Sequence, residues 1–131
     1  MIVIDTDILI DHFHGNEAAK AFIREKLLSG ETLTISVVTV SEIIAGMRSG
    51  EEQRTEMLFG LFNIFPVDVT IARIAGAYLN RYPSANELDL GDVLIAATAL
   101  VNGAELYTRN VRHYPMDDII VKIPYERGKR G

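Results

Sequence analysis

The sequence predicts an α/β fold with three layers, in which a central, mainly parallel sheet of about five short strands is flanked by helices. Short apolar runs rich in β-branched residues recur along the chain, and segments with helical periodicity separate them. Strands joined through helices pair in parallel and carry helices on both faces. The 131 residues, 48% of them hydrophobic, are enough for one compact core, so we expect a single domain over residues 1–131.

The first part of the chain predicts a strand, two helices and a second strand. The expected elements cover residues 1–4, 7–13, 17–28 and 32–37. The first strand is apolar on both faces, which is typical of a buried strand. Gly15 ends the first helix, Asn16 is a favourable N-cap for the second, and Gly30 ends the second. The last segment is a strand because β-branched residues dominate it.

The middle of the chain predicts two helices, a strand and a third helix. The expected elements cover residues 40–48, 51–62, 64–67 and 70–82. Gly50 separates the first two helices, and Pro83 ends the third. We expect the strand despite Pro66, and we expect it to be short because proline cannot donate to a sheet.

The last part predicts a loop, an apolar helix and two more strands around a turn. The expected elements are a loop at 84–88, a helix at 91–102, a strand at 105–108, a helical turn at 110–114 and a strand at 119–123. Gly103 stops the apolar helix. Residues 127–131 are rich in basic side chains, and we expect a flexible tail there.

The charge is distributed unevenly around a net value of −5. Residues 1–108 contain seven basic and fifteen acidic side chains, whereas residues 109–131 contain six basic and three acidic ones. An acidic body argues against a general duplex binder, whose affinity comes from many phosphate contacts. A basic rim in the last segment would still steer a nucleic-acid strand toward an acidic centre, although a solvated tail explains the same charges.

Two absences in the sequence bear on where the protein works. The chain has no cysteine, which excludes disulfides and thiolate metal sites and fits a reducing compartment. It also lacks a run of about 18 apolar residues, so no membrane-spanning segment is expected. We therefore expect a cytoplasmic protein with no membrane partner.

Three carboxylates stand among apolar neighbours. Asp5 follows the first strand, Glu42 lies in the first turn of the helix expected at 40–48, and Asp92 opens the apolar helix. In an open parallel sheet, sites form beyond the carboxyl ends of the strands, where these three side chains are expected to meet. Buried acids are costly unless they are paired or bound to a metal, so the pattern indicates a hard divalent cation.

Each carboxylate also has a structural explanation. Asp92 can start a helix with Asp89 as its N-cap, because the helix dipole favours acids in the first turn by about 0.3 to 1 kcal/mol. Asp5 can be a turn residue, and Glu42 can pair with a nearby arginine. A metal site is the more economical interpretation, because otherwise three acids with separate structural roles would lie at the same end of one sheet.

Four stretches of the sequence resemble the ordered motifs of PIN domains. The first, residues 2–11, is an apolar strand that runs into Asp-Thr-Asp, and the second, residues 36–43, contains one glutamate. The third, residues 92–99, is an aspartate followed by an Ile-Ala-Ala helix, and the fourth is residues 107–114. The motifs follow in order over nearly the whole chain and are most similar to those of VapC-type toxins of toxin–antitoxin pairs.

The resemblance implies a Mg²⁺- or Mn²⁺-dependent endoribonuclease, in which a metal-activated water hydrolyses RNA phosphodiester bonds. It implies that Asp5, Glu42 and Asp92 are the catalytic metal ligands, and hard carboxylate oxygens suit these ions. The remaining roles are hydrogen bonding to the ligands or to phosphate, for Thr6, Thr108 and Asn110, and holding the RNA backbone, for Arg109 and Arg112.

One position departs from the family pattern. His113 stands where many relatives carry an aspartate or glutamate that completes a cluster of four acids. A further ligand would come from Asp7, Asp89, Asp117, Asp118 or His113 itself, or be absent. A lone histidine beside Tyr114 is more often a packing or phosphate-contacting residue, so we expect one tightly held ion rather than a pair.

Two other functions fit parts of the sequence. Residues 3–9 also resemble the opening motif of haloacid-dehalogenase-type phosphatases, in which Asp5 would be the nucleophile. That chemistry needs a lysine between its motifs, and the chain has none between Lys26 and Lys122. The other alternative is a catalytically degenerate PIN domain that only binds RNA or protein. The missing fourth acid favours it, and the intact triad argues against it.

The resemblance also implies partners. They are an RNA substrate, a cognate antitoxin that inserts a segment into the active-site groove, and a second copy of the chain in a homodimer. An acidic groove suits a basic antitoxin side chain such as arginine. Apolar residues at 59–65 would serve such contacts or form an ordinary core, and we prefer the core interpretation.

Overall fold

The computed structural model describes residues 1–82 and 88–126, which include a five-stranded sheet. The strands are β1 (Ile2–Ile4), β2 (Leu33–Ser36), β3 (Asn63–Phe65), β4 (Glu105–Tyr107) and β5 (Val121–Lys122). They pair in the order β3-β2-β1-β4-β5, and every pairing is parallel. The predicted parallel sheet of short strands is confirmed.

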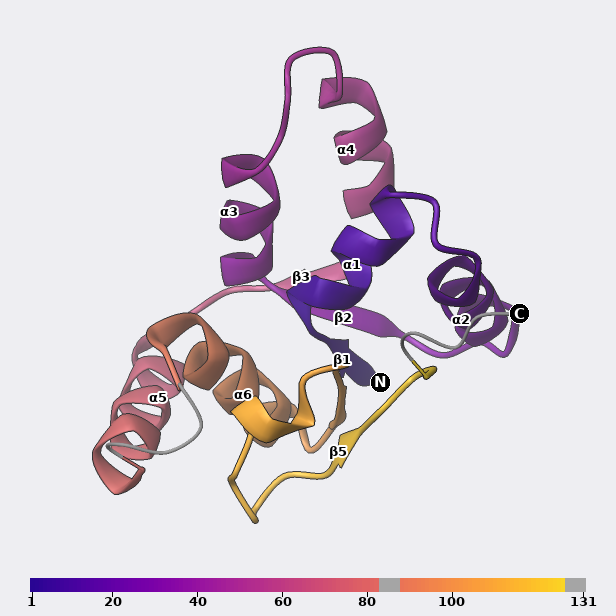
Figure 1. The fold of residues 1–131 in the computed structure, drawn as a ribbon. Helices are drawn as coiled ribbons and strands as arrows, with labels where there is room; N and C mark the ends of the chain where they lie inside the picture. Colours follow the sequence, from indigo (N-terminus) through magenta and orange to yellow (C-terminus); the bar gives the residue numbers. More distant parts are fainter. Residues whose placement is uncertain (83–87, 127–131) are drawn as a thin grey trace.

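Helices cover both faces of this sheet, as predicted. They are α1 (Thr6–Phe13), α2 (Glu17–Leu28), α3 (Val37–Ala45), α4 (Glu52–Phe59), α5 (Val69–Arg81), α6 (Leu90–Asn102) and the 3-10 turn η1 (Val111–His113). Helices α1 to α4 lie on one side of the sheet, and α5 and α6 lie on the other (Figure 1). Within the described ranges, no helix has the length and apolar character needed to cross a membrane.

Two hydrophobic cores form because strand side chains alternate between the faces of the sheet. Ile2 and Ile4 pack in a cluster with α1, α2 and α4, whereas Val3 packs in a second cluster with α5 and α6. In β4, Leu106 belongs to the second cluster and Tyr107 to the first. The run of β1 that is apolar on both faces is thus buried on both faces.

The carboxyl edge of the sheet brings distant segments together. Strand β1 lies between β2 and β4, so the residues that follow these three strands are neighbours. Asp5 follows β1, helix α3 follows β2 directly, and Thr108 follows β4. This edge is where the predicted site residues are expected to meet.

Helix α3 begins three residues earlier than predicted. Ser36 ends β2, and its Oγ accepts a hydrogen bond from the Val38 N–H at 3.0 Å, which caps the helix. The β-branched residues that follow predicted a longer strand, but the cap starts the helix at Val37. Glu42 therefore lies in the second turn of α3, and the expectation that it lies in the first turn was wrong.

Other boundaries differ by a few residues. Strand β3 ends at Phe65, because Pro66 has no N–H to donate. Of the apolar residues at 59–65, Phe59 and Phe62 are buried in the first core, whereas Leu61 and Ile64 are exposed. The predicted tail at 127–131 and most of the predicted loop at 84–88 lie outside the described residues.

Candidate active site

Asp5 is buried at the carboxyl end of β1, where it caps helix α1. Its Oδ1 accepts a hydrogen bond from the Thr6 N–H at 2.7 Å. Its Oδ2 accepts hydrogen bonds from the hydroxyls of Thr108, at 2.7 Å, and Tyr114, at 2.9 Å. Donors from α1, from the residues after β4 and from the end of η1 therefore fix this carboxylate in one orientation.

Glu42 is joined to the same region through Thr6. The Thr6 hydroxyl donates to Glu42 Oε1 at 2.5 Å and lies 2.9 Å from the Thr39 hydroxyl. Gly91 in α6 lies against the other carboxylate oxygen, since a Cβ at this position would be 2.9 Å from Glu42 Oε2. The absence of a side chain at Gly91 thus lets α6 approach the Glu42 carboxylate closely.

Asp92 lies in the first turn of α6, and Asp89 is the N-cap of this helix, as predicted. The Asp92 N–H donates to Asp89 Oδ1 at 2.9 Å, and the Asp89 N–H donates to Asp92 Oδ2 at 3.4 Å. His113 Nδ1 lies 3.6 Å from Asp92 Oδ2. Asp92 thus has a capping role, and it also contacts the histidine that replaces the expected fourth acid.

The three carboxylates form one electrostatic cluster. Burial raises the pKa of Asp92 to about 7, and the charges of Asp89 and Asp5 add to this rise. Burial also raises the pKa of Glu42, again with a contribution from Asp5, although Glu42 is the most exposed of the three. Burial raises the pKa of Asp5 itself, against the effect of its three hydrogen bonds. Holding all three acids ionised is therefore unfavourable without added positive charge.

Asp7 anchors the residues that follow β4. Its Oδ2 accepts hydrogen bonds from the Arg109 N–H and from Asn110 Nδ2, both at 3.1 Å. Its Oδ1 is buried and has no hydrogen-bond partner among the described residues. Burial and the charge of Asp5 raise the pKa of Asp7 to about 6. A buried carboxylate oxygen without a partner is a position that a cation or an ordered water would complete.

The two arginines expected to hold RNA lie in different environments. Arg112, in η1, is exposed. The Arg109 side chain is 11% exposed, and its Nε lies 3.0 Å from Asp11 Oδ2 and 3.9 Å from Asp7 Oδ2. The structure therefore places Arg109 in an ion-pair network with helix α1, whereas Arg112 is accessible to a ligand.

The predicted metal ligands are near one another without forming a closed cage. In residues 1–82 and 88–126, no three His, Asp or Glu side chains are arranged so that they would hold a metal ion as they stand. Asp5 and Glu42 are connected through Thr6, and Asp92 is connected to them through its charge. Their hard oxygen donors, the raised pKa values and the unpaired Asp7 oxygen fit a divalent cation.

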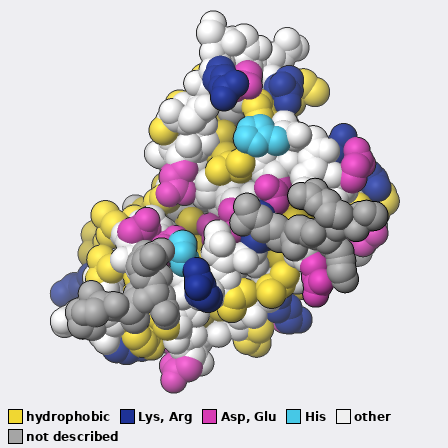
Figure 2. Space-filling model, in the orientation of Figure 1, with side chains coloured by type: hydrophobic (Ala, Val, Ile, Leu, Met, Phe, Trp, Pro, Cys, Tyr) yellow, Lys and Arg dark blue, Asp and Glu magenta, His cyan; other side chains and the backbone are white. Residues whose placement is uncertain are grey.

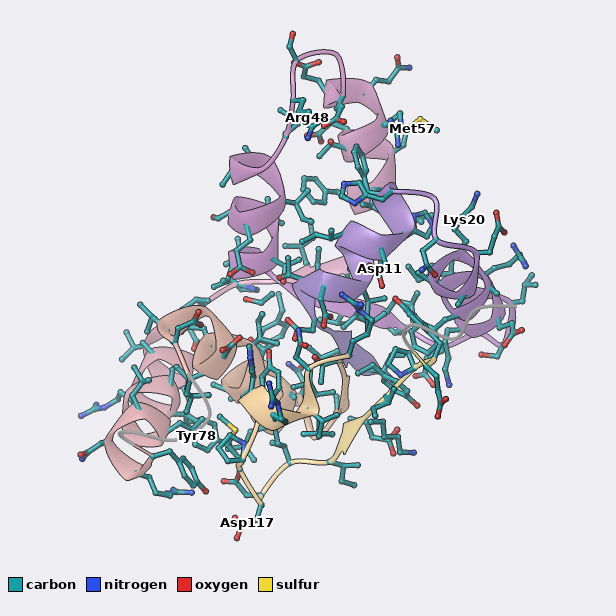
Figure 3. All side chains as sticks on the ribbon, in the orientation of Figure 1. Asp11, Lys20, Arg48, Met57, Tyr78 and Asp117 are labelled. Carbon is teal, nitrogen blue, oxygen red and sulfur yellow. The ribbon has the colours of Figure 1, made fainter. Side chains whose placement is uncertain are left out.

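A cavity of about 310 Å³ adjoins Glu42 between α1, α3 and α4. Its apolar wall includes Phe13, Ile43 and Met47. Helices α3 and α4 project from the sheet, and Arg48, which also lines the cavity, lies near their far end (Figures 1 and 3). Acidic side chains gather across the middle of this face, below the projecting helices (Figure 2). Of the three carboxylates, Glu42 lines this cavity.

Comparison with known proteins gives the family. The profile of the PIN domain matches residues 2–119. The chain belongs to the PIN domain family. This PIN domain is 44% identical over 117 residues to Ribonuclease VapC10 of Mycobacterium tuberculosis, covering 88% of this chain and 87% of that protein. It is 41% identical to Ribonuclease VapC19 of the same organism, covering 88% of this chain and 94% of the relative.

Solved structures agree with the fold and with the predicted family. A toxin–antitoxin complex from Klebsiella pneumoniae contains a chain that is 34% identical to this PIN domain, with a TM-score of 0.77. The alignment covers 96% of this chain and 99% of that one. The resemblance to VapC-type PIN domains that the four motifs indicated is confirmed.

Sequence reasoning did not identify every residue of the site. It named Tyr114 as part of a motif but not as a donor to Asp5, and it gave no role to Thr39, Asp11 or Tyr125. A buried tyrosine hydroxyl needs a hydrogen-bond partner, so a tyrosine at the end of the fourth motif could have indicated a donor to one of the site carboxylates. Thr39, Asp11 and Tyr125 contact segments far from them in the chain, and no local sequence pattern indicates such contacts.

Proposed function

We propose that this PIN domain is a divalent-metal-dependent endoribonuclease and the toxin of a type II toxin–antitoxin pair. The observation that carries the proposal is that Asp5, Glu42 and Asp92 meet at the carboxyl edge of the sheet. Thr6 hydrogen-bonds to both Asp5 and Glu42, and Gly91, the neighbour of Asp92, lies against the Glu42 carboxylate. In the described chain, His113 is the one basic side chain in ion-pair contact with these three acids. The ribonucleases that align with 88% of the chain support RNA as the substrate, and RNA cleavage implies action in the cytoplasm.

We infer that the required positive charge is Mg²⁺ or Mn²⁺, held by Asp5, Glu42 and Asp92. Carboxylate oxygens are the preferred donors of both ions. When bound, such an ion lowers the pKa of a water and offsets the charge that develops on the phosphate. Among the candidate extra ligands, Asp7 is favoured over Asp89, because Asp7 has an unpaired oxygen and Asp89 is engaged as a helix cap.

The protein side chains prepare the site in distinct ways. Thr108 and Tyr114 hold Asp5 by donating to one oxygen, and the Thr6 N–H holds the other. Glu42 or Asp92 would orient the attacking water and accept its proton, because a carboxylate oxygen can accept a hydrogen bond from a water held beside it. Fixed ligands of this kind lower the reorganisation needed when the phosphate charge develops.

RNA is held at the surface beside these carboxylates. Arg112 is exposed in η1, next to His113, which contacts Asp92. A guanidinium there pairs with a backbone phosphate and offsets the repulsion between RNA and the acidic site. Thr6 and Asn110 are engaged within the protein, so they support the carboxylates rather than contact RNA.

The antitoxin occupies the cavity beside Glu42. The apolar wall with Phe13 and Met47 suits an amphipathic segment, and Glu42 and Glu51 suit a basic side chain on it. The similar chain from Klebsiella pneumoniae was solved as a toxin–antitoxin complex, which supports a partner of this kind. Exposed apolar residues, Ile64 in the edge strand β3 and Val69 at the start of α5, favour a homodimer through this edge of the sheet.

The phosphatase alternative has no support in the arrangement of Asp5. That chemistry needs a lysine near the phosphoryl group, and the sequence has none between Lys26 and Lys122. The donors around Asp5 that the structure adds are the Thr6 N–H and the hydroxyls of Thr108 and Tyr114. A degenerate domain that only binds RNA remains the second candidate, because His113 replaces the fourth acid that many relatives carry.

The proposal is tested by RNA cleavage with antitoxin-free protein. A mixed RNA pool is incubated with and without Mn²⁺, and the Asp92→Asn variant is run beside the wild type. The matched control is Asp117→Asn, which removes an exposed acid between η1 and β5 (Figure 3). Metal-dependent cuts that disappear only in Asp92→Asn are expected. Equal cleavage by both variants, or RNA binding without cleavage by the wild type, would overturn the enzymatic proposal.

A further inference from the structure

A chain of polar contacts joins the C-terminal segment to helix α1 and to the candidate site. The Tyr125 hydroxyl donates to Asp11 Oδ2 at 2.7 Å. The same Asp11 oxygen lies 3.0 Å from Arg109 Nε, and Arg109 Nε lies 3.9 Å from Asp7 Oδ2. Asp11 lies in the second turn of α1 (Figure 3), so the chain connects segments that are more than a hundred positions apart in the sequence.

These groups are shielded from solvent. The side chains of Arg109, Asp7 and Asp11 are 11%, 14% and 18% exposed. The Arg109 Nε is buried and makes these contacts as ion pairs, without a hydrogen bond among the described residues. Charge attraction therefore keeps the guanidinium beside the two carboxylates, because separating the charges would leave each one buried and unpaired. Tyr125 is half-buried against the first core, where its ring lies edge-on to Phe22 at 6.5 Å.

The network ends on residues that determine how Asp5 is held. Arg109 lies between Thr108, which donates to Asp5, and Asn110, which donates to Asp7. The Asn110 N–H donates to the Thr108 hydroxyl at 3.0 Å, which directs the hydroxyl hydrogen toward Asp5. A shift of residues 108–110 would therefore change the hydrogen bond to Asp5.

We propose that Arg109, Asp11 and Tyr125 form a clasp of positioning residues that holds residues 108–110, and through Thr108 the Asp5 carboxylate, in the orientation needed to bind metal. The inference rests on the proposed function of Asp5 as a ligand. It assigns Arg109 to the interior of the protein rather than to the RNA. It also assigns a role in the site to the segment that contains Tyr125, which follows the last strand.

The clasp orients a metal ligand from outside, as hydrogen-bond partners of metal ligands do in other metal sites. Groups that orient a ligand are typically worth about ten- to a hundredfold in metal affinity or activity. Tyr125 lies two contacts further from Asp5 than Thr108 does, so we expect an effect near the lower end of this range. Both the affinity for Mn²⁺ and kcat should fall, whereas KM for RNA should change little because no clasp residue contacts RNA.

The test compares two tyrosine variants that lose matched hydrogen bonds. Tyr125→Phe loses the bond to Asp11, and the control Tyr78→Phe loses a bond of 2.8 Å to Asp118, a residue outside the clasp. Mn²⁺ affinity is measured by calorimetry, kcat and KM by RNA cleavage, and amide exchange at Arg109 and Asn110 by NMR in metal-free protein. We expect about tenfold weaker Mn²⁺ binding and faster exchange at both amides in Tyr125→Phe only.

Two further variants separate positioning from simple loss of stability. Arg109→Lys keeps a cation within reach of Asp11 and should recover most of the affinity that Arg109→Met loses. Unchanged exchange at Arg109 and Asn110 in Tyr125→Phe would overturn the clasp, whatever the activity. If the wild type instead bound no Mn²⁺ and cleaved no RNA while exchange rose as expected, the clasp would stand as a structural device and the proposed function would fail.

Discussion

Replacing Asp92 by asparagine should stabilise the metal-free protein at pH 8. Burial raises the pKa of Asp92 from 3.8 to about 7. The native state therefore keeps this proton over a range where the unfolded chain has lost it, and the stability of the metal-free protein falls as pH rises from about 4 to 7. The full shift corresponds to about 4 kcal/mol, and partial solvent exposure reduces it to roughly 1–2 kcal/mol.

Losing a negative charge in the first turn of α6 opposes this gain by about 0.3 to 1 kcal/mol. The net stabilisation expected for Asp92→Asn is about 1 kcal/mol, or roughly 3–5 °C in Tm for a chain of this size. The assay is thermal unfolding in EDTA at pH 5 and pH 8, with Asp117→Asn as the control for loss of one negative charge. The difference between wild type and Asp92→Asn should shrink at pH 5, where Asp92 is protonated in the folded, metal-free wild type and its burial no longer costs stability.

Addition of Mn²⁺ should reverse the order of stability at pH 8. Ligand at a hundred times its dissociation constant stabilises a binding protein by about 2.7 kcal/mol, and Asp92→Asn should lose most of this gain. An Asp92→Asn variant that is less stable than wild type at both pH values, with equal responses to Mn²⁺, would refute the reasoning. Asp92 would then only stabilise the first turn of α6, as the partner of the N-cap Asp89.

Three other variants test separate parts of the site. Gly91→Ala places a Cβ 2.9 Å from Glu42 Oε2. We expect kcat for RNA cleavage to fall about tenfold, while the free energy of unfolding changes by less than about 1 kcal/mol. An unchanged kcat would mean that the Glu42 carboxylate can move without affecting cleavage. Thr108→Val removes one of two hydroxyl donors to Asp5 Oδ2 and should weaken Mn²⁺ binding about tenfold in calorimetry. Arg112→Ala should raise KM for RNA, leave kcat unchanged and reduce the salt dependence of binding by about one phosphate contact; a salt dependence equal to that of wild type would exclude the contact.

Local sequence patterns predicted the fold well because each pattern reflects a physical preference of the residues that form it. Glycines at helix ends, apolar runs buried on both faces and β-branched segments gave the order of the elements and the parallel sheet. The start of α3 was missed for an equally local reason. Val37 and Val38 favour a strand by propensity, but the Ser36 hydroxyl caps the next turn and starts a helix.

The position of the site followed from the topology, and its internal contacts did not. Asp5 and Asp92 could be placed at one edge of the sheet because that edge is fixed once the strands are parallel. The pairing of Asp11 with Tyr125 joins residues separated by 114 positions. Such a contact depends on the direction in which the chain continues after the last strand, and no sequence periodicity in either segment predicts it.

The contrast between Asp5 and Asp7 shows why residue type alone did not assign roles. Both are aspartates at the start of α1, and both have pKa values raised by burial. Hydroxyl donors and a helix amide hold the Asp5 carboxylate, whereas the Asp7 carboxylate accepts a hydrogen bond from the Arg109 N–H and holds the residues after β4. The role of each carboxylate is therefore set by the donors that other segments bring to it, and those donors become visible only when β1 and β4 lie side by side.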